Sequence, residues 1–391
     1  MAFHARQSED AERPRGPVTV AAVKALILAG GSGTRLRPIT HTSAKQLVPV
    51  AGKPILFYGL EAMADAGIKD VGIIVGETAP EIRAAVGDGS QWRLSVTYIP
   101  QEEPLGLAHC VLIARGFLGD DDFVMYLGDN LLRQPLREVL DGFEVARARA
   151  AQPAFGEEDE GVPAAAILLA PVDDPRQFGV AVLDPSGRVI GLVEKPEEPP
   201  SDLALTGVYV FDRRIHEAVR AIRPSGRGEL EITDAIQWLI DSGHPVRSQL
   251  VSGWWIDTGK LTPLLEANRL VLETLERRVD GDVDDESRIE GRVVVETGAT
   301  VRGSTVRGPT VIGAGSVVTD SFIGPFTAVD ADCEIVRTDL EHSVVCAGSS
   351  VHDGGRIVDS LIGRHVTVRR APGQPRANRQ VLGDDSDVEL A

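Results

Sequence analysis

The chain has 391 residues, of which 43% are hydrophobic and 25% charged, and its formal net charge at pH 7 is −18. These values are typical of a globular protein with two or three domains, and the negative charge disfavours nucleic acid and anionic membranes as partners. No run approaches the ~20 apolar residues that cross a bilayer, and the polar first residues lack the apolar centre of a secretory signal. Three scattered cysteines without a CxxC pair predict a cytoplasmic protein with reduced thiols.

Short apolar runs alternate with helical patterns in the first two thirds of the chain. Residues 23–29 form the first run, and Pro54 opens a helical pattern that ends at Gly67. Further strands are predicted at 71–75, 96–99, 123–127, 166–170, 180–183 and 208–211. This alternation predicts an α/β domain with a Rossmann-like, mainly parallel sheet covered by helices on both faces. The acidic residues 152–162 are expected to form a surface insertion.

The segment that joins the two halves of the chain begins with Asp257-Thr258-Gly259. An apolar stripe from Leu261 to Val279 predicts one helix there, which would pack against a neighbour. The acidic segment Asp280–Glu286 follows, and it is expected to be a hinge between two domains.

Beyond that segment, aliphatic residues recur in steps of six, mostly in groups of three. The series is Ile289, Val295, Val301; Val306, Ile312, Val318; Ile323, Val329, Ile335; then Val345, Val351, Ile357, Ile362 and Val368. This repeat predicts a three-sided parallel β-helix that buries one aliphatic residue on each side of a coil. Glycines suited to its corners are Gly298, Gly303, Gly308, Gly313 and Gly324. The predicted organisation is a flexible tail (1–22), an α/β domain (23–280), a β-helix (281–382) and an acidic tail (383–391).

The first candidate site is a glycine-rich loop after the first strand, in LILAGGSGTRLRP. Glycines allow backbone N–H groups to approach phosphate oxygens, and Arg35 adds a charged donor. The surroundings support an anion site, because no Asp or Glu occurs from Arg13 to Leu60 while seven basic residues do. The loop lacks the Gly-Lys-Ser/Thr of a Walker A motif and the third glycine of a dinucleotide fingerprint. By itself, the pattern also fits a glycine turn without a ligand.

Two aspartates and a lysine are the next candidates. Asp129, in YLGDN, stands at the carboxyl end of a predicted buried strand, where ligands bind in open α/β sheets. Asp257, in WWIDTG, is a second carboxylate that could join it in holding Mg²⁺, provided that the fold brings the two together. Lys45 lies beside apolar residues, which would place its ammonium at the mouth of a structured site.

A sugar phosphate would need a further set of polar groups. Gly179, Glu194, Lys195 and the Thr206-Gly207 pair are suitable, since Glu194 could accept protons from sugar hydroxyls and Lys195 could pair with a phosphate. An ordinary charged loop is the alternative reading of Glu194-Lys195-Pro196.

Together these motifs resemble one enzyme family. The segment KALILAGGSGTRLRPITHTSAKQLVPVAGKPILFYGLE is similar to the opening of glucose-1-phosphate thymidylyltransferases, and QEEPLGLAHC, YLGDN, FGVAVLD, VEKP, LTGVYVFD, RGELEITDAI and WWIDTGK follow in that family's order. The resemblance spans about 23–382. It is strongest to the long form, which carries a carboxyl-terminal left-handed β-helix and occurs in bacterial deoxysugar and antibiotic pathways.

The resemblance implies a reaction and a role for each matching residue. The sugar phosphate would attack the α-phosphorus of dTTP, giving dTDP-glucose and pyrophosphate, with Mg²⁺ as cofactor. Catalytic roles fall to Arg35, Lys45 and Asp129, and the metal would be held by Asp129 and Asp257. Nucleotide contacts fall to Gly30, Gly31, Ser32, Gly33, Thr34, Gln46, Gln101 and Gly106. Sugar-phosphate contacts fall to Gly179, Glu194, Lys195, Thr206 and Tyr209.

Other functions stay open at this point. The same chemistry could use UTP or another hexose 1-phosphate, because thymine and uracil differ by one methyl group, worth only about 1–3 kcal/mol. A remote alternative is a β-helix acyltransferase with His342 as its base. A binding protein without activity is disfavoured by the joint presence of Lys45, Asp129 and Asp257. The β-helix is expected to serve assembly or regulation, with copies of the chain forming a homo-oligomer.

Overall fold

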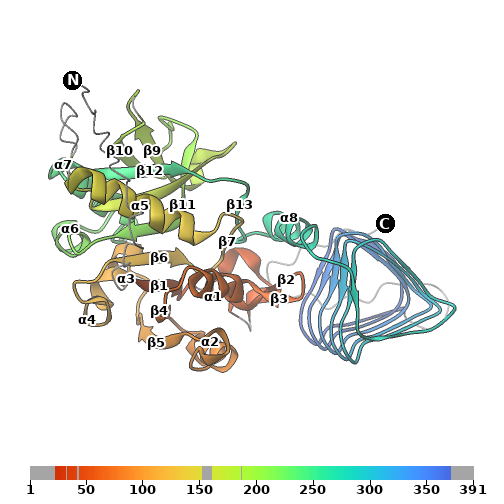
Figure 1. Cartoon of the computed structure of the whole chain (residues 1–391). Helices are drawn as coiled ribbons and strands as arrows, with labels where there is room; N and C mark the ends of the chain where they lie inside the picture. The colour runs from red at the N-terminus through yellow and green to blue at the C-terminus, as the bar shows by residue number, and fades with distance from the viewer. Residues whose placement is uncertain (1–22, 32, 42–43, 152–160, 186, 371–391) are drawn as a thin grey trace, which may run out of the picture.

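The computed structural model describes residues 23–31, 33–41, 44–151, 161–185 and 187–370. The predicted tails and most of the predicted insertion at 152–162 lie outside these residues. An α/β domain forms one side of the molecule and a triangular β-helix the other, with helix α8 between them (Figure 1). Among the described residues, no helix is long and apolar enough to span a membrane.

A nine-stranded mixed sheet forms the centre of the α/β domain. Its strands are β1 (Lys24–Ala29), β4 (Asp70–Val75), β5 (Ser95–Pro100), β6 (Phe123–Leu127), β8 (Ala165–Pro171), β9 (Gly179–Leu183), β10 (Val189–Glu194), β11 (Leu203–Phe211) and β12 (Val246–Leu250). The main path runs β10-β9-β11-β6-β1-β4-β5, and β8 pairs with β11 and β12. Strands β6, β1, β4 and β5 are mutually parallel, whereas β11 pairs with β6 in the antiparallel sense. Every strand predicted in this domain is present.

Helices cover both faces of this sheet, as the sequence predicts. The α-helices are α1 (Ile55–Asp65), α2 (Ala79–Val86), α3 (Leu107–Ile113), α4 (Arg115–Leu118), α5 (Leu136–Ala151), α6 (Ile215–Ala221) and α7 (Ile232–Asp241), and the short 3-10 helices are η1 (Thr34–Leu36), η2 (Ile39–His41), η3 (Lys45–Leu47), η4 (Ser90–Trp92) and η5 (Pro175–Gln177). Alternate residues of β1 enter two cores. Leu26 and Leu28 pack on the side of α3, α6 and α7, while Ala25 and Ile27 pack on the side of α1, α2 and α5. Burial on both faces explains the unbroken apolar run.

Two short strand pairs lie beside the main sheet. Strands β2 (Pro49–Val50) and β3 (Lys53–Pro54) form a small hairpin before α1. Strands β7 (Asn130–Leu132) and β13 (Trp255–Asp257) are antiparallel, and their register places Asp257 opposite Asn130. This pairing brings two distant segments to the carboxyl end of β6.

The β-helix has three parallel faces. One face contains β14 (Arg278–Val279), β17 (Val293–Val295), β20 (Thr310–Ile312), β23 (Thr327–Val329), β25 (Val344–Val345) and β27 (Leu361–Ile362). The other faces contain β15 (Asp282–Val283), β16 (Arg288–Glu290), β18 (Thr300–Arg302), β19 (Thr305–Arg307), β21 (Val317–Thr319), β22 (Phe322–Ile323) and β28 (Thr367–Arg369), together with β24 (Glu334–Glu341) and β26 (Ser350–Val358), which each take part in both. The predicted aliphatic series fills or borders the interior.

The structure also fills a gap in that series. Leu340 is fully buried and lies in register with Ile323 and Ile357, so it supplies the interior side chain between Ile335 and Val345. The repeat seemed interrupted because both flanking steps are five residues instead of six. At the corners, Gly298 and Gly303 adopt positive φ as expected. Gly313 is instead required by close packing, since a Cβ there would lie 2.6 Å from the backbone of Asp330.

Two predictions about the connection are wrong. Helix α8 (Leu261–Leu272) ends well before Val279, and the chain then enters β14. The segment Asp280–Glu286 is not a free hinge, because β15 lies within it and pairs in parallel with β18. Backbone pairing with the next coil outweighs the acidic composition on which the hinge prediction rested.

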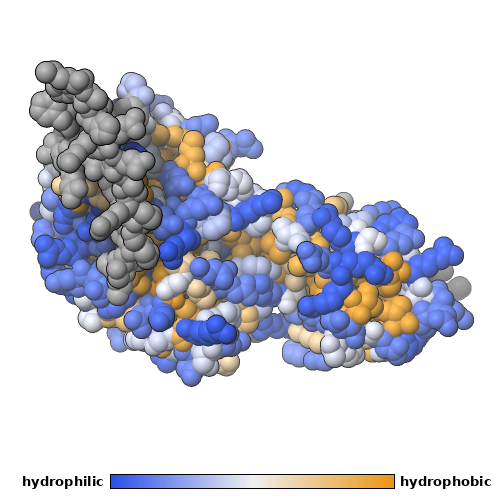
Figure 2. Space-filling view, viewed as in Figure 1, coloured by the Kyte–Doolittle hydropathy of each residue, from blue (hydrophilic) through white to orange (hydrophobic). Residues whose placement is uncertain are grey.

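The β-helix is packed directly against the α/β domain. Outward-facing residues of its first face, including Val294, Val311 and Val344, share one apolar cluster with Leu264 of α8 and Val48. This contact explains why strands such as β17 are apolar at every position, since both of their faces are buried. Much of the visible surface of both parts is hydrophilic (Figure 2).

Candidate active site

A cavity of about 590 Å³ opens at the carboxyl ends of β1 and β6. Its walls contain Leu28, Gly30, Gly31, Arg35, Lys45, Gln46, Ile74, Gln101, Pro104, Gly106, Leu107, Cys110, Leu127, Asp129, Asn130, Gln177, Phe178, Gly179, Glu194, Lys195, Leu205, Tyr209, Arg227, Glu229, Glu231, Ile232, Thr233 and Asp257. Ligands bind at this edge of open α/β sheets, where consecutive strands feed loops on opposite sides. Most of the predicted site residues therefore meet in one place.

The glycine loop forms the floor of the cavity next to β1. A Cβ on Gly31 would lie 3.1 Å from Cε of Lys45, and a Cβ on Gly30 would lie 3.4 Å from Oε1 of Gln101. Side chains at these two positions would crowd the polar groups that face the cavity. The loop is glycine-rich because two functional side chains lie over it.

The 3-10 helix η3 presents two of the predicted residues. Nζ of Lys45 forms a salt bridge with Oδ2 of Asp129. Gln46 is only 1% exposed, and its buried Oε1 has no hydrogen-bond partner among the described residues. Since buried polar atoms are nearly always paired, this orphan amide oxygen at the cavity wall is ready to accept a hydrogen bond from a ligand.

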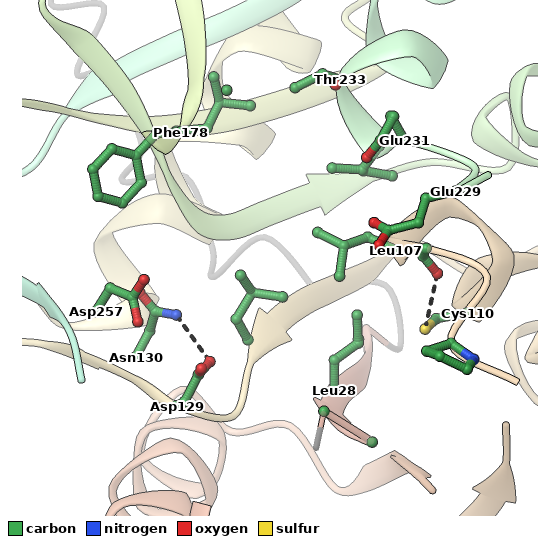
Figure 3. A pocket seen from close by; sticks show the side chains of 18 of the residues that line it. Leu28, Leu107, Cys110, Asp129, Asn130, Phe178, Glu229, Glu231, Thr233 and Asp257 are labelled. Carbon is green, nitrogen blue, oxygen red and sulfur yellow. Dashed lines mark hydrogen bonds between the residues drawn. The ribbon is translucent and has the colours of Figure 1, made fainter. Parts of the chain in front are cut away.

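The two predicted metal ligands are brought together by the β7–β13 pair (Figure 3). The backbone N and Oγ1 of Thr258 donate to the backbone O of Asp129, at 3.2 and 2.7 Å, which ties the segment after Asp257 to the end of β6. Burial raises the pKa of Asp257, and the neighbouring Asp129 carboxylate raises that pKa further. Binding of a cation between the two carboxylates would stabilise their ionised forms.

This pair fits a divalent metal that completes its coordination with ligand atoms. Among the described residues, no three His, Cys, Asp or Glu side chains converge on one point. Two carboxylates in a cavity suit Mg²⁺, which commonly takes one or two carboxylates and otherwise binds phosphate oxygens and water. Arg35 lines the same cavity as Asp257, and its positive charge lowers the pKa of that carboxyl.

One end of the cavity is formed by Gln101, Gly106, Leu107 and Cys110. Gly106 has φ of +102°, and a Cβ there would lie 2.4 Å from the backbone O of Leu230, so only glycine fits. Two backbone hydrogen bonds, from Leu230 N to Leu105 O and from Ala108 N to Leu230 O, join this loop to the segment that carries Glu229 and Glu231. Burial raises the pKa of the Cys110 thiol to about 12, so Cys110 is a packing residue.

The adjoining wall, which continues from the segment around Leu230, carries a network of acidic and basic groups. Nη2 of Arg227 lies 3.1 Å from Oε1 of Glu194 and 2.8 Å from Oε1 of Glu231. Lys195 is adjacent, with Nζ 3.6 Å from Oε1 of Glu194. Burial raises the pKa of Glu194, while Lys195 lowers it. Glu229, Glu231 and Thr233 lie together on this wall, away from Asp129 and Asp257 (Figure 3).

A few predicted residues do not line the cavity. Thr206 is fully buried within β11, and its hydroxyl donates to the backbone O of Leu168, so its predicted place in the sugar pocket is wrong. Gly33 lies behind Lys45, where a Cβ would approach that side chain to 2.9 Å. Ser32 lies outside the described residues, and Thr34 begins η1.

Several residues that line the cavity are not among the site residues that the sequence predicts. Arg227, Glu231 and Thr233 belong to RGELEITDAI, a segment that resembles the family but for which the resemblance implies no role. The available signal is one arginine followed by two closely spaced glutamates, Glu229 and Glu231, immediately before an amphipathic helix. Gln177 and Phe178, which precede Gly179, were also missed.

The fold and the cavity together define a nucleotidyltransferase. The nucleotidyl transferase family model matches residues 24–274. Among solved structures, a protein from Bacillus anthracis described as a glucose-1-phosphate thymidylyltransferase superposes with a TM-score of 0.57 at 34% identity, covering 64% of this chain and 95% of the other. A UDP-glucose pyrophosphorylase superposes with a TM-score of 0.55 at 22% identity, over 64% of this chain and 98% of the other, which indicates a shared fold.

Curated relatives narrow the class further. A glucose-1-phosphate thymidylyltransferase from Streptomyces griseus is 60% identical over 369 residues, which are 94% of this chain and 100% of the relative. Its counterpart from Streptomyces antibioticus is 56% identical over 368 residues, or 94% and 99% of the two chains. The chain therefore belongs to the glucose-1-phosphate thymidylyltransferase family, and the match extends through the β-helix.

Proposed function

We propose that this protein transfers a thymidylyl group from dTTP to glucose 1-phosphate, releasing pyrophosphate and forming dTDP-glucose. The observation that carries the proposal is the arrangement of the cavity. A glycine loop with Lys45 lies on one side, a polar network around Glu194 lies on another, and the carboxylate pair Asp129 and Asp257 lies at the same site. The cavity thus offers places for a triphosphate, a sugar phosphate and a metal.

The nucleotide would lie over the glycine loop. Backbone groups of Gly30 and Gly31 and the guanidinium of Arg35 would hold the β- and γ-phosphates, and Lys45 would neutralise charge near the α-phosphate. Gln46, Gln101 and Gly106 would contact the base. The orphan Oε1 of Gln46 supports this assignment, because a bound nucleotide can supply the missing donor.

The sugar phosphate would lie against the wall that carries Glu194. Glu194 would accept protons from sugar hydroxyls, and Lys195 with Arg227 would pair with the phosphate. Gly179 gives the sugar room, since a Cβ there would come within 3.1 Å of Oε2 of Glu194. Tyr209 completes this wall, and burial raises the pKa of its hydroxyl, which therefore stays protonated.

Catalysis would depend on position and charge. A sugar-phosphate oxygen would attack the α-phosphorus in line with the departing pyrophosphate, so the protein has to align two anions and offset their repulsion. Lys45 and Arg35 supply positive charge on the leaving-group side. A Mg²⁺ ion held by Asp129 and Asp257 would bind phosphate oxygens and stabilise the charge that develops on them. Divalent metals are in general use among nucleotidyltransferases of this family.

The test is pyrophosphate release measured over a grid of nucleoside triphosphates and sugar 1-phosphates, with Mg²⁺ or with EDTA. We expect dTTP with glucose 1-phosphate to give the highest kcat/KM, and EDTA to abolish turnover. A grid in which no pair turns over would disprove the proposal. Higher kcat/KM with UTP or with another hexose 1-phosphate would identify the alternative substrates instead.

The acyltransferase alternative has less support. His342 lies in the β-helix, away from the residues that line the cavity, and its Nδ1 is 2.5 Å from Oδ1 of Asp359 at an exposed position. Acetyl transfer from acetyl-CoA that disappears in His342→Ala would establish that activity.

We further propose that the protein forms a homo-oligomer in the cytoplasm. All three cysteines are free and buried, which suits a reducing compartment. Light scattering on the purified full chain measures the oligomeric state. A monomer at micromolar concentrations would exclude the homo-oligomer.

A further inference from the structure

The side chain of Gln101 has an orientation that its neighbours determine. Its Nε2 lies 3.3 Å from the backbone O of Gly106 and 3.1 Å from Nδ1 of His109. A backbone carbonyl can only accept a hydrogen bond, so the group that faces Gly106 is the NH₂ of the amide. Nδ1 of His109 lies on the same side and must therefore accept as well. The tautomer that fits this contact carries its proton on Nε2.

This orientation turns the amide oxygen toward the glycine loop. Oε1 of Gln101 lies 3.4 Å from the point that a Cβ on Gly30 would occupy, and both Gln101 and Gly30 line the cavity. Oε1 of Gln101 is therefore a hydrogen-bond acceptor on the cavity wall, while Nε2 of the same amide already donates to Gly106 and His109. With His109 removed, the amide would keep only its 3.3 Å contact with Gly106 and its hydrogen bond with the side chain of Cys110 among the described residues.

We propose that His109 is a positioning residue that makes the base pocket select pyrimidines with a ring N–H donor. Thymine and uracil carry a hydrogen on N3, which Oε1 of Gln101 can accept. Cytosine has an unprotonated N3, so two acceptors would face each other. The inference rests on the proposed function, in which this end of the cavity holds the base.

His109 acts through Gln101 and is not among the residues that line the cavity. It lies in the first turn of α3, and its ring is partly exposed, so substitutions there leave the buried residues Ala108 and Cys110 in place. A polar site built to pair with one hydrogen-bond pattern discriminates strongly against the reversed pattern, because the mismatched groups stay unpaired. Loosening the amide should reduce that discrimination, since a rotated NH₂ can then serve N3 of cytosine.

The experiment compares kcat/KM for dTTP and dCTP, each with glucose 1-phosphate, in wild type and in three His109 variants. His109→Leu removes the acceptor, His109→Lys offers only a donor, and His109→Asn offers an amide oxygen near the position of Nδ1. We expect the dTTP/dCTP ratio to fall at least about tenfold in the Leu and Lys variants, through a higher KM for dTTP. The Asn variant should stay within about threefold of wild type.

Three controls separate positioning from general damage. The KM for glucose 1-phosphate and the dTTP/UTP ratio should not change, since thymine and uracil share the N3 hydrogen. His352→Leu, which alters a partly exposed histidine of the β-helix, should leave every ratio unchanged. In a Gln101→Ala background, adding His109→Leu should change the dTTP/dCTP ratio by less than about twofold, because the two residues act as one unit.

The outcomes are distinct. A wild type that turns over no dTTP contradicts the proposed function, and this inference with it. An active wild type whose Leu and Lys variants keep the dTTP/dCTP ratio contradicts the role of His109 alone. An equal loss in the Gln101→Ala background would also overturn it, by showing that His109 acts independently. Thermal melting identifies any variant that fails to fold, and the remaining folded variants then decide.

Discussion

Lys45 forms a salt bridge with Asp129 on the floor of the cavity, and Asp129 in turn raises the pKa of Asp257. Lys45 and Arg35 both act on this pair of carboxylates, since the positive charge of each lowers the pKa of Asp257. Burial and the charge of Asp129 nevertheless leave the pKa of Asp257 above its ordinary value, so a divalent cation would relieve repulsion that the two basic side chains do not remove. Perturbed carboxylates in a cavity are typical of functional sites.

Asp257→Asn should trade activity for stability. Removing one of two repelling carboxylates should raise the melting temperature in EDTA by about 1 °C, equivalent to about 1 kcal/mol in a chain of this length. The same change removes a metal ligand, so kcat should fall at least about a hundredfold. Differential scanning calorimetry and pyrophosphate release measure the two effects. A variant with normal kcat would show that Asp257 holds no metal.

Lys45→Met should alter the response of the protein to metal. In wild type the ammonium occupies Oδ2 of Asp129, so a metal ion competes with it. Without that competitor, Mg²⁺ should raise the melting temperature of Lys45→Met more than that of wild type. The variant should nevertheless lose most of its kcat, because the charge near the α-phosphate is missing. If Mg²⁺ raises the melting temperature of both proteins equally, the salt bridge between Lys45 and Asp129 does not compete with metal binding.

Arg227→Lys should impair the sugar phosphate specifically. The guanidinium contacts Glu194 and Glu231 together, and a lysine offers a single point charge in place of a planar fork. We expect the KM for glucose 1-phosphate to rise about tenfold or more while the KM for dTTP changes little. Steady-state kinetics with each substrate varied in turn will test this. Arg302→Lys, on the exposed β-helix surface, serves as the matched control.

Asn268→Leu should weaken the junction between the two domains. The fully buried Asn268 of α8 accepts from the backbone N of Ala51 at 2.8 Å and donates to the backbone O of Phe326 at 2.9 Å, so it links the β2–β3 turn to the β-helix. Leucine would leave both backbone groups unpaired, which costs about 2–4 kcal/mol of stability. Chemical denaturation measures this loss as a lower free energy of unfolding. If the free energy of unfolding of Asn268→Leu equals that of wild type, the apolar cluster alone stabilises the junction.

The pH dependence of stability should report His216. Burial lowers the pKa of this imidazole below its ordinary value of 6.5, so the folded state binds the proton less well than the unfolded chain does. Stability from this group is therefore complete above about pH 6.5 and is lost as the pH falls below it. The melting temperature of wild type should drop more steeply from pH 7 to pH 5.5 than that of His216→Leu. Parallel curves would exclude a contribution from His216.

Much of the architecture follows from patterns that have a direct physical cause. The buried run at 23–29 predicts a central parallel strand, and the step of six predicts the β-helix, because each pattern matches the geometry of one element. Other features could not be predicted because they depend on local departures from these patterns or on contacts between domains. Leu340 was missed because two steps of five replaced steps of six, and the burial of Val294 and Val311 depends on a neighbouring domain.

The site could be predicted only in part. Asp129 and Asp257 were recognisable as strand-end carboxylates, but their meeting depends on β7 pairing with β13, two short strands with little pattern of their own. Thr206 was misplaced because the β11 register shifts between Leu205 and Tyr209, where simple alternation of faces no longer applies. The orientation of Gln101 depends on hydrogen bonds that no sequence pattern records.

The register of the β-helix limits how its length can vary during evolution. Ile289 pairs with Val306, and Val306 with Ile323, so equivalent positions are 17 residues apart. Each coil contacts chiefly its neighbours, so a whole extra coil at the carboxyl-terminal end would leave the docked face and the cavity unaltered. An insertion of a few residues inside a strand would instead turn interior side chains outward along every later coil. Relatives should therefore differ in this domain by multiples of about one coil, with smaller insertions confined to the corners.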